Sequence, residues 1–176
     1  MELRNLGADD LWIYEAQNAP EMMEHLGGPR SMEGMADKLR RDVAATEADE
    51  YWVLVIVPDD DPSAAAGTVA VWSHEDHEEP INEIGWMVLP QYQGRGIATS
   101  AVGAVLNRAR ATGRWDVLHA FPSVTNAASN AICRKLGFEK IGEQDFPLPW
   151  APDKILRCNH WRLDLRPAFR PHLRSG

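Results

Sequence analysis

The sequence predicts an α/β protein with a mixed, largely antiparallel central sheet flanked by helices. Two segments rich in Val, Trp and Tyr, Tyr51–Val57 and Thr68–Trp72, flank the turn-forming residues Asp59–Ser63, which is typical of a β-hairpin. A third apolar stretch, Asn82–Leu89, leads through a glycine-bearing turn into a segment whose apolar residues recur at helical spacing. Strand–helix units follow, so the sheet is expected to be mixed.

The remaining elements can be placed in chain order from their patterns and end signals. Ser31 is a favourable N-cap, and Gly113 and Gly137 stand where helices are expected to end. Strands are expected at Met1–Leu6, Tyr51–Val57, Thr68–Trp72, Asn82–Leu89, Val117–Phe121, Glu139–Gln144 and Cys158–Leu163. Helices are expected at Ala8–Ala16, Glu21–Leu26, Met32–Ala45, Ile97 to the cap at Gly113, and Asn126–Leu136.

Length and composition favour one cytoplasmic domain. The 176 residues are 44% apolar and 25% charged, and we expect a single domain over 1–165 with a loose tail over 166–176. No apolar run reaches the roughly 18 residues of a membrane helix, and the N-terminal residues do not resemble a signal peptide. A net charge of −8 argues against nucleic-acid binding. Cys133 and Cys158 are expected to be reduced thiols.

The segment Gln91–Thr99 carries the clearest functional signal. It joins a buried strand to the start of an amphipathic helix, where unpaired amides and the helix dipole favour a phosphate. Gly94 and Gly96 lack the Cβ atoms that would keep a diphosphate from the backbone, and Arg95 and Thr99 can add donors. A P-loop would require a lysine that is absent, and Thr99 occupies the third small position of a Rossmann fingerprint. A turn that only caps the helix remains an alternative.

Two sequence blocks resemble the GNAT-type N-acetyltransferases. The stretch Glu83–Thr99 resembles their acetyl-CoA signature, in which Gln91, Gly94 and Gly96 match the pattern Gln/Arg-x-x-Gly-x-Gly/Ala. The stretch Asn126–Phe138 resembles their later motif, which contains Asn, then Ser three residues on, and ends in Lys-x-Gly-Phe. Residues 26–31 are similar to the branch that contains ribosomal-protein alanine acetyltransferases. The resemblance implies the GNAT fold over roughly residues 1–165 and acetyl-CoA as co-substrate.

The resemblance also implies where acetyl-CoA binds. The pyrophosphate is expected on the amides of Gln93 through Ala98, and the pantetheine arm in a split between the strand ending at Leu89 and the strand Val117–Phe121. Asn126 is expected to bond the pantetheine, to cap the following helix, or both. The expected cofactor-binding residues are Met87, Val88, Leu89, Gln91, Gln93, Gly94, Arg95, Gly96, Ile97, Ala98, Thr99, Asn126 and Ser129.

The reaction implied is direct attack of a primary amine on the thioester in a ternary complex. An amine arrives mostly protonated, so a base is needed, and the resemblance assigns this role to Glu83, with Glu143 and Asp145 as weaker candidates. A backbone amide near Met87, in a distorted strand, is expected to bind the oxyanion. Many relatives place a tyrosine acid where Cys133 stands, so Ser129 is preferred as acid and Cys133 comes second, with a core role as its alternative.

Several alternatives remain open at this level. The acceptor can be a small amine or a protein N-terminus, and the protein a monomer or homodimer. A non-catalytic acyl-CoA-binding sensor on the same fold is the rival function. The acidic run His74–Glu79 is a cationic-substrate collar, a metal site using His74 and His77, or a solvated loop, and no metal is expected. The segment Phe146–Pro152 with Glu21–Arg30 walls the acceptor pocket or packs over the sheet edge.

Overall fold

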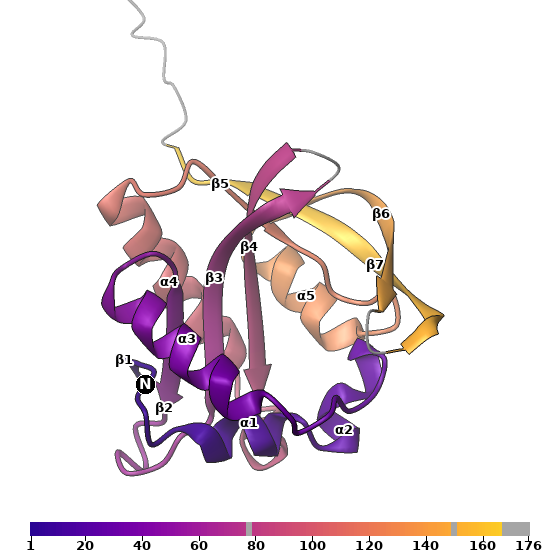
Figure 1. Cartoon of the computed structure of the whole chain (residues 1–176). Coiled ribbons are helices and arrows are strands. Elements are labelled where there is room, and N and C mark those ends of the chain that lie inside the picture. Colours follow the sequence, from indigo (N-terminus) through magenta and orange to yellow (C-terminus); the bar gives the residue numbers. More distant parts are fainter. Residues whose placement is uncertain (77–78, 149–150, 167–176) are drawn as a thin grey trace, which may run out of the picture.

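The computed structural model describes residues 1–76, 79–148 and 151–166, and a seven-stranded sheet forms its centre (Figure 1). The strand order is β1-β2-β3-β4-β5-β7-β6, and every neighbouring pair is antiparallel except β4 with β5. This arrangement confirms the expected fold class. The elements in chain order are β1 (Glu2–Asn5), α1 (Leu11–Gln17), α2 (Pro20–Met23), the 3₁₀ turn η1 (Glu24–Leu26), α3 (Met35–Glu47), β2 (Trp52–Val57), β3 (Gly67–Asp76), β4 (Glu79–Val88), the 3₁₀ turn η2 (Pro90–Tyr92), α4 (Ile97–Thr112), β5 (Val117–Ala120), α5 (Ala127–Lys135), β6 (Glu139–Leu148) and β7 (Ala151–Asp164).

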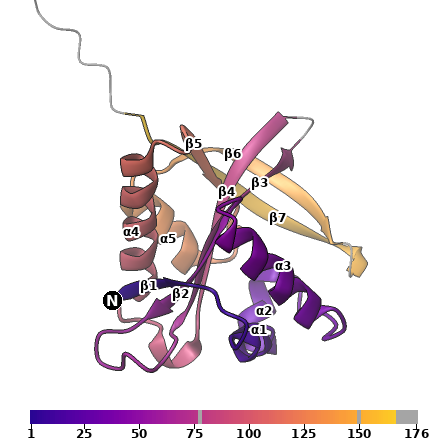
Figure 2. The same cartoon turned by 60° about the vertical axis from the view of Figure 1, so that its left-hand side comes forward.

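Helices cover both faces of the sheet, as Figure 2 shows, with α4 and α5 on one side and α1, α2 and α3 on the other. All six residues of β2 are therefore buried, and its run Trp-Val-Leu-Val-Ile-Val has no polar position. Leu54 and Ile56 pack into the cluster that includes α4, whereas Val53 and Val55 pack with Ile13 and Leu39 of α1 and α3. The two apolar clusters fix the sheet between its helical layers.

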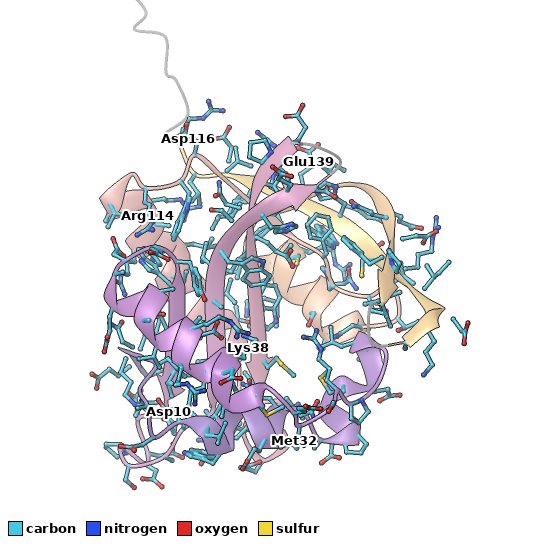
Figure 3. All side chains as sticks on the ribbon, in the orientation of Figure 1. Asp10, Met32, Lys38, Arg114, Asp116 and Glu139 are labelled. Atoms are coloured by element: carbon cyan, nitrogen blue, oxygen red, sulfur yellow. The ribbon has the colours of Figure 1, made fainter. Side chains whose placement is uncertain are left out.

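An ion pair ties the first strand to the first helix. Arg4 on β1 donates to both carboxylate oxygens of Asp10, each at 2.7 Å, and Asp10 also accepts from the Gly7 amide at 2.7 Å. Asp10 is labelled beside the start of α1 in Figure 3, which also labels Lys38 on α3. Because bidentate pairs of this kind impose geometry as well as energy, Asp10 orients α1 against the sheet.

The structure corrects several expected boundaries. The third helix begins at Met35 and not at Met32, with Gly34 as its N-cap at φ 79°. Ser31 is not a helix cap, since its hydroxyl accepts from the Glu33 amide at 3.2 Å in a local turn. The third strand continues past Trp72 to Asp76. The sixth strand continues past Gln144 to Leu148, and the seventh begins at Ala151 and not at Cys158. Charged residues on these extensions hid the strands from the sequence pattern.

Some expectations fall outside the described part of the chain. The loose tail is expected over 166–176, of which 167–176 are not described, and neither are His77, Glu78, Pro149 and Trp150. Among the described residues, no helix combines the length and apolar character that crossing a membrane requires. The single-domain boundary at residue 165 stays a prediction.

Candidate active site

The two central parallel strands separate inside the sheet. Glu83 of β4 lies opposite His119 of β5, after which β5 ends at Ala120 while β4 continues to Val88. The main chain of the later part of β4 therefore faces an opening, the split, rather than a neighbouring strand. This is the place where the pantetheine arm was expected.

The glycine turn leads from the end of β4 into α4 and has the expected geometry. Gly94 and Gly96 adopt left-handed φ values of 72° and 76°, and a Cβ atom on either would meet nothing within 4 Å. Gly96 is also the N-cap of α4 and offers no side-chain acceptor, so the first-turn amides of Ile97, Ala98 and Thr99 point outward without a cap. These amides and the helix dipole suit a diphosphate, so the residues present fit CoA.

The alternation of main-chain groups along β4 decides which amides face the split. The Leu89 amide donates to the Ala66 carbonyl, 2.8 Å away, and so points toward the β3 side. The Val88 carbonyl points the other way and accepts from Gln93 Nε2 at 2.8 Å. Since alternate residues of a strand direct their main-chain groups to opposite sides, Trp86 and Val88 face the split, and Met87 faces β3.

The sequence predicted a distorted strand near Met87, and this prediction is wrong on the side of β4 that pairs with β3. The β3–β4 register runs without a shift from Gly67 opposite Val88 to Asp76 opposite Glu79, with Thr68 opposite Met87. A regular ladder leaves no unpaired amide at Met87, because its N–H lies on the side of Thr68. The main-chain groups directed into the split near Met87 are those of Trp86 and Val88, one residue to either side.

The polar side chains of the turn make contacts of their own. Arg95 donates to Asp60 of the β2–β3 loop at 2.5 Å, and its guanidinium lies 5.7 Å from the centre of the Tyr92 ring. Gln91 lies in η2 and is exposed, and Thr99 is half-buried. An arginine already paired with Asp60 must give up or share that pair to contact a phosphate.

The second motif forms the start of α5. Asn126 Oδ1 accepts from the Ser129 amide at 3.0 Å, which shows the helix-capping role. Because the cap uses only Oδ1, it is compatible with a pantetheine contact from Asn126 Nδ2. Ser129 is half-buried in the first turn of α5, whereas Cys133 is fully buried in the core shared with α4. Burial raises the pKa of the Cys133 thiol to about 12, so the geometry favours its core role.

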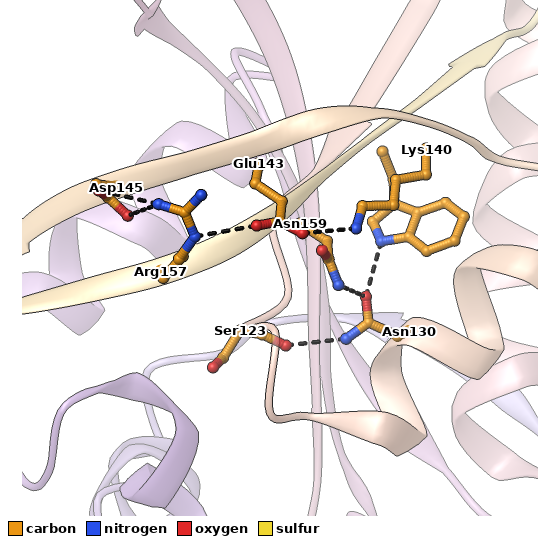
Figure 4. A network of polar contacts seen from close by, with 8 residues as sticks. Ser123, Asn130, Lys140, Glu143, Asp145, Arg157 and Asn159 are labelled. Atoms are coloured by element: carbon orange, nitrogen blue, oxygen red, sulfur yellow. Dashed lines mark hydrogen bonds and ion pairs between the residues drawn. The ribbon is translucent and has the colours of Figure 1, made fainter.

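A buried amide holds the loop before α5 against β7 (Figure 4). Asn130 donates to the Ser123 carbonyl at 2.9 Å, and its Oδ1 accepts from Asn159 Nδ2 at 2.7 Å and Trp161 Nε1 at 2.8 Å. Buried amides with several partners impose one arrangement, so the network fixes where Asn126 stands.

Glu83 has the electrostatic environment of a general base. Its side chain is 19% exposed, and one carboxylate oxygen lies 2.8 Å from His74 Nε2. Burial raises the pKa of Glu83 to about 7; the His74 hydrogen bond opposes this shift and nearby Asp76 adds to it. A carboxylate that titrates near neutrality can take a proton from an ammonium and release it again. By contrast, hydrogen bonds from Lys140 and Arg157 lower the pKa of exposed Glu143.

A cavity of about 440 Å³ opens in front of Glu83. Its aromatic wall includes Trp72, whose ring lies so close to Gly85 that a Cβ there would come within 2.9 Å of Trp72 Cη2. Trp72 is therefore a half-buried wall of this cavity. The lining residues are Trp72, His74, Glu75, Asp76, Glu83, Gln144, Asp145, Phe146 and Pro147.

The segments that were expected to wall the acceptor pocket do meet. Gly27, after η1, lies against Leu148, and its carbonyl is 3.4 Å from Lys154 Nζ. His25 Nδ1 lies 3.1 Å from Thr125 Oγ1 in the loop before α5. Segment 24–28 thus bridges the β6–β7 hairpin and the loop that carries the second motif.

The acidic run is mainly strand and not loop. His74, Glu75 and Asp76 end β3, and Glu79 begins β4, while His77 and Glu78 lie outside the described residues. Within the described ranges, no three His, Cys, Asp or Glu side chains come together as a metal-binding group. His74 contacts Glu83, a role that the sequence pattern did not suggest. Period-two alternation along β3 would have placed Trp72, His74 and Asp76 on one face.

These features define an acyl-CoA-dependent transferase fold, and comparisons with known proteins agree. Residues 1–139 match the family model described as the acetyltransferase (GNAT) domain. Since the match covers most of the 176 residues, the chain belongs to the GNAT acetyltransferase family.

Solved structures share the fold over nearly the whole chain. The protein yncA from Salmonella typhimurium, solved with its cofactor acetyl-CoA, is 22% identical with a TM-score of 0.71, covering 98% of both chains. The ribosomal-protein-S5-alanine acetyltransferase from Vibrio fischeri is 18% identical with a TM-score of 0.72, covering 96% of this chain and 94% of the other. A Salmonella typhimurium acetyl transferase that modifies the N-terminal serine of ribosomal protein L7/L12 is 16% identical with a TM-score of 0.75, covering 92% and 93%.

Proposed function

We propose that this protein transfers an acetyl group from acetyl-CoA to a primary amine by direct attack in a ternary complex. The observation that carries the proposal is Glu83, a half-buried carboxylate with a pKa of about 7 that stands where β4 and β5 separate and faces a cavity of about 440 Å³. Membership of the GNAT family supports acetyl transfer in general, and the primary amine is the acceptor that we propose.

The proposed base and the proposed cofactor-binding groups lie on different sides of the sheet. Ile84 packs into the core under α4, so its neighbour Glu83 faces the opposite side, toward the cavity. We assign Glu83 to removing a proton from the acceptor ammonium there. The first-turn amides of α4 and the glycine turn hold the pyrophosphate, and the main-chain groups of Trp86 and Val88 contact the pantetheine arm and the developing oxyanion.

The leaving thiolate is expected on the α5 side of the split, where Ser129 stands. Ser129→Ala should lower kcat about tenfold with little change in acetyl-CoA affinity, because it removes one proton donor. Cys133→Ala should leave kcat within about twofold and cost roughly 1 kcal/mol of stability through lost core packing. Steady-state kinetics and denaturant unfolding of both variants check the assignment. A large loss of kcat in Cys133→Ala with nearly unchanged kcat in Ser129→Ala would make Cys133 the acid.

A thermal-shift titration with acetyl-CoA, CoA, ATP and NAD tests the donor site. At about 100 times Kd a ligand stabilises the fold by about 2.7 kcal/mol, a shift of several degrees. We expect stabilisation by the two CoA species alone. Stabilisation by ATP or NAD without CoA would indicate a nucleotide-binding module, and no response to CoA would leave the glycine turn as a helix cap.

The acceptor remains a choice between a small amine and a protein N-terminus. The ribosomal-protein acetyltransferases among the similar structures support a protein acceptor. The cavity of about 440 Å³ equally admits a small amine. Cytoplasmic location and a monomeric or homodimeric state stay predictions.

A further inference from the structure

His74 and Glu83 form a hydrogen-bonded pair across two adjacent strands. Glu83 on β4 lies opposite Trp72 on β3, and His74 is two residues further along β3, on the same face. The imidazole reaches diagonally across the ladder and places Nε2 at 2.8 Å from Glu83 Oε2. Both side chains line the cavity, and His74, at 31% exposed, is more accessible than Glu83 at 19%.

The other imidazole nitrogen determines what the pair can do. His74 Nδ1 lies 3.1 Å from the main-chain carbonyl oxygen of Glu75, an atom that can only accept a hydrogen bond. Nδ1 therefore carries a hydrogen. The contact between Nε2 and Oε2 then holds a single shared proton, either as imidazolium with carboxylate or as imidazole with carboxylic acid. The pair is hydrogen-bonded in both forms.

Other carboxylates lie around this pair. Glu75 and Asp76 on β3 and Asp145 on β6 also line the cavity. Asp145 is bonded to Arg157 at 3.0 Å, and Asp76 accepts from Gln144 Nε2 at 2.5 Å. Burial raises the pKa of Glu83 most, and of these carboxylates Asp76 raises it further through its negative charge.

On β5 and β7, burial shifts titratable groups near Glu83 toward their neutral forms. Burial, with His160 and Arg162 nearby, lowers the pKa of His119 to about 4, and burial also lowers the pKa of His160. His119 Nδ1 and His160 Nε2 lie 2.7 Å apart, as two neutral imidazoles can. Burial raises the pKa of the Cys158 thiol to about 11. The lowered imidazole pKa values, and a thiol that is already protonated, make these three groups weak acceptors for the proton that leaves Glu83.

We propose that His74 is the positioning residue for Glu83 and the next carrier of the proton that Glu83 removes from the acceptor. The reacting form is the one from which the shared proton has left to solvent, so Glu83 is a carboxylate and His74 Nε2 has no hydrogen. The ammonium N–H bond breaks as the Glu83 O–H bond forms, which leaves a neutral amine to attack. The O–H bond then breaks as the His74 Nε2–H bond forms, and the imidazolium keeps its Nδ1 hydrogen and loses the Nε2 proton to solvent. This inference rests on the proposed function, since it assumes Glu83 as the base.

His74→Ala and His74→Gln separate this role from a structural one. In His74→Ala, Glu83 loses the hydrogen bond that stabilises its charged form, so the acid limb of the kcat profile should move to higher pH. We expect kcat at pH 7 to fall roughly tenfold, KM for acetyl-CoA to stay within about twofold, and added imidazole to restore part of the rate. His74→Gln keeps a hydrogen-bond donor but carries no proton, so it should keep the limb near its wild-type position with reduced kcat.

Ser73→Ala serves as the control for disturbance of β3, because exposed Ser73 alternates with His74 and bonds Asn82 on the other face. It should behave as wild type. A wild-type pH profile and kcat in His74→Ala would overturn the proposal. So would a uniform loss of kcat with no shift of the limb and no rescue by imidazole. Full activity of a Glu83→Gln variant would instead refute Glu83 as base, and with it the proposed function's mechanism.

Discussion

Glu83→Gln is expected to lower kcat by about 10²- to 10⁴-fold while leaving acetyl-CoA affinity nearly unchanged. Glutamine has the size of glutamate and can still bond His74, but it cannot accept a proton from the ammonium. Because the pKa of Glu83 is about 7, the carboxylate is mostly ionised above that pH and mostly protonated below it. The wild-type rate should therefore rise with pH through about 7, and this limb should vanish in the variant.

Glu143→Gln is the matched control for that experiment. Glu143 is an exposed carboxylate on the same sheet, and hydrogen bonds from Lys140 and Arg157 lower its pKa, so it stays charged at neutral pH. We expect wild-type kcat and an unchanged acid limb for this variant. If Glu143→Gln loses activity and Glu83→Gln keeps it, the base lies on β6 and the assignment to Glu83 is wrong.

Gly94→Glu should weaken CoA binding on the order of 100-fold. The side chain would project into the space in front of the glycine turn, since a Cβ at Gly94 meets nothing within 4 Å. A carboxylate about 4 Å from a phosphate costs roughly 1–4 kcal/mol at a protein surface, which corresponds to that loss. The thermal-shift titration with CoA measures it, as a midpoint displaced to higher ligand concentration.

Backbone strain must be separated from this effect, because Gly94 has φ 72° and glutamate resists that conformation. Gly113→Glu provides the control at the opposite end of α4, where Gly113 has φ 61° and a Cβ also meets nothing within 4 Å. Both variants should lose similar stability without ligand, but only Gly94→Glu should lose CoA binding. Equal binding by the two variants would contradict the placement of the diphosphate.

Local patterns predicted the elements around the proposed diphosphate site. The amphipathic run from Ile97 and the cap at Gly113 predicted α4, and the Val-rich and aromatic run of β2 predicted a strand, which the structure buries on both faces. Gly94 and Gly96 predicted a turn whose backbone a diphosphate could approach, and in the structure both adopt left-handed backbone. These features depend on residues close in sequence, so a single chain is enough to reveal them.

Pairing between distant segments was not predictable in the same way. The contact of His74 with Glu83 depends on the register of β3 against β4, and the charged end of β3 resembled a solvated loop. Which amide faces the split likewise depends on the ladder, which directs the amide of Met87 toward β3 and those of Trp86 and Val88 into the split. Trp72 shows the same limit, because its strand was predicted from the sequence but the face that it occupies was not.

The most direct test of the central claim is acetyl-CoA-dependent release of free thiol in the presence of amines. The panel should contain polyamines, amino-acid amides and short peptides with free N-termini, and each product should be identified by mass spectrometry. We expect thiol release that requires an amine, rises with pH through about 7, and is lost in Glu83→Gln. Acetyl-CoA binding without thiol release for any amine would contradict the enzyme and favour the acyl-CoA-binding sensor.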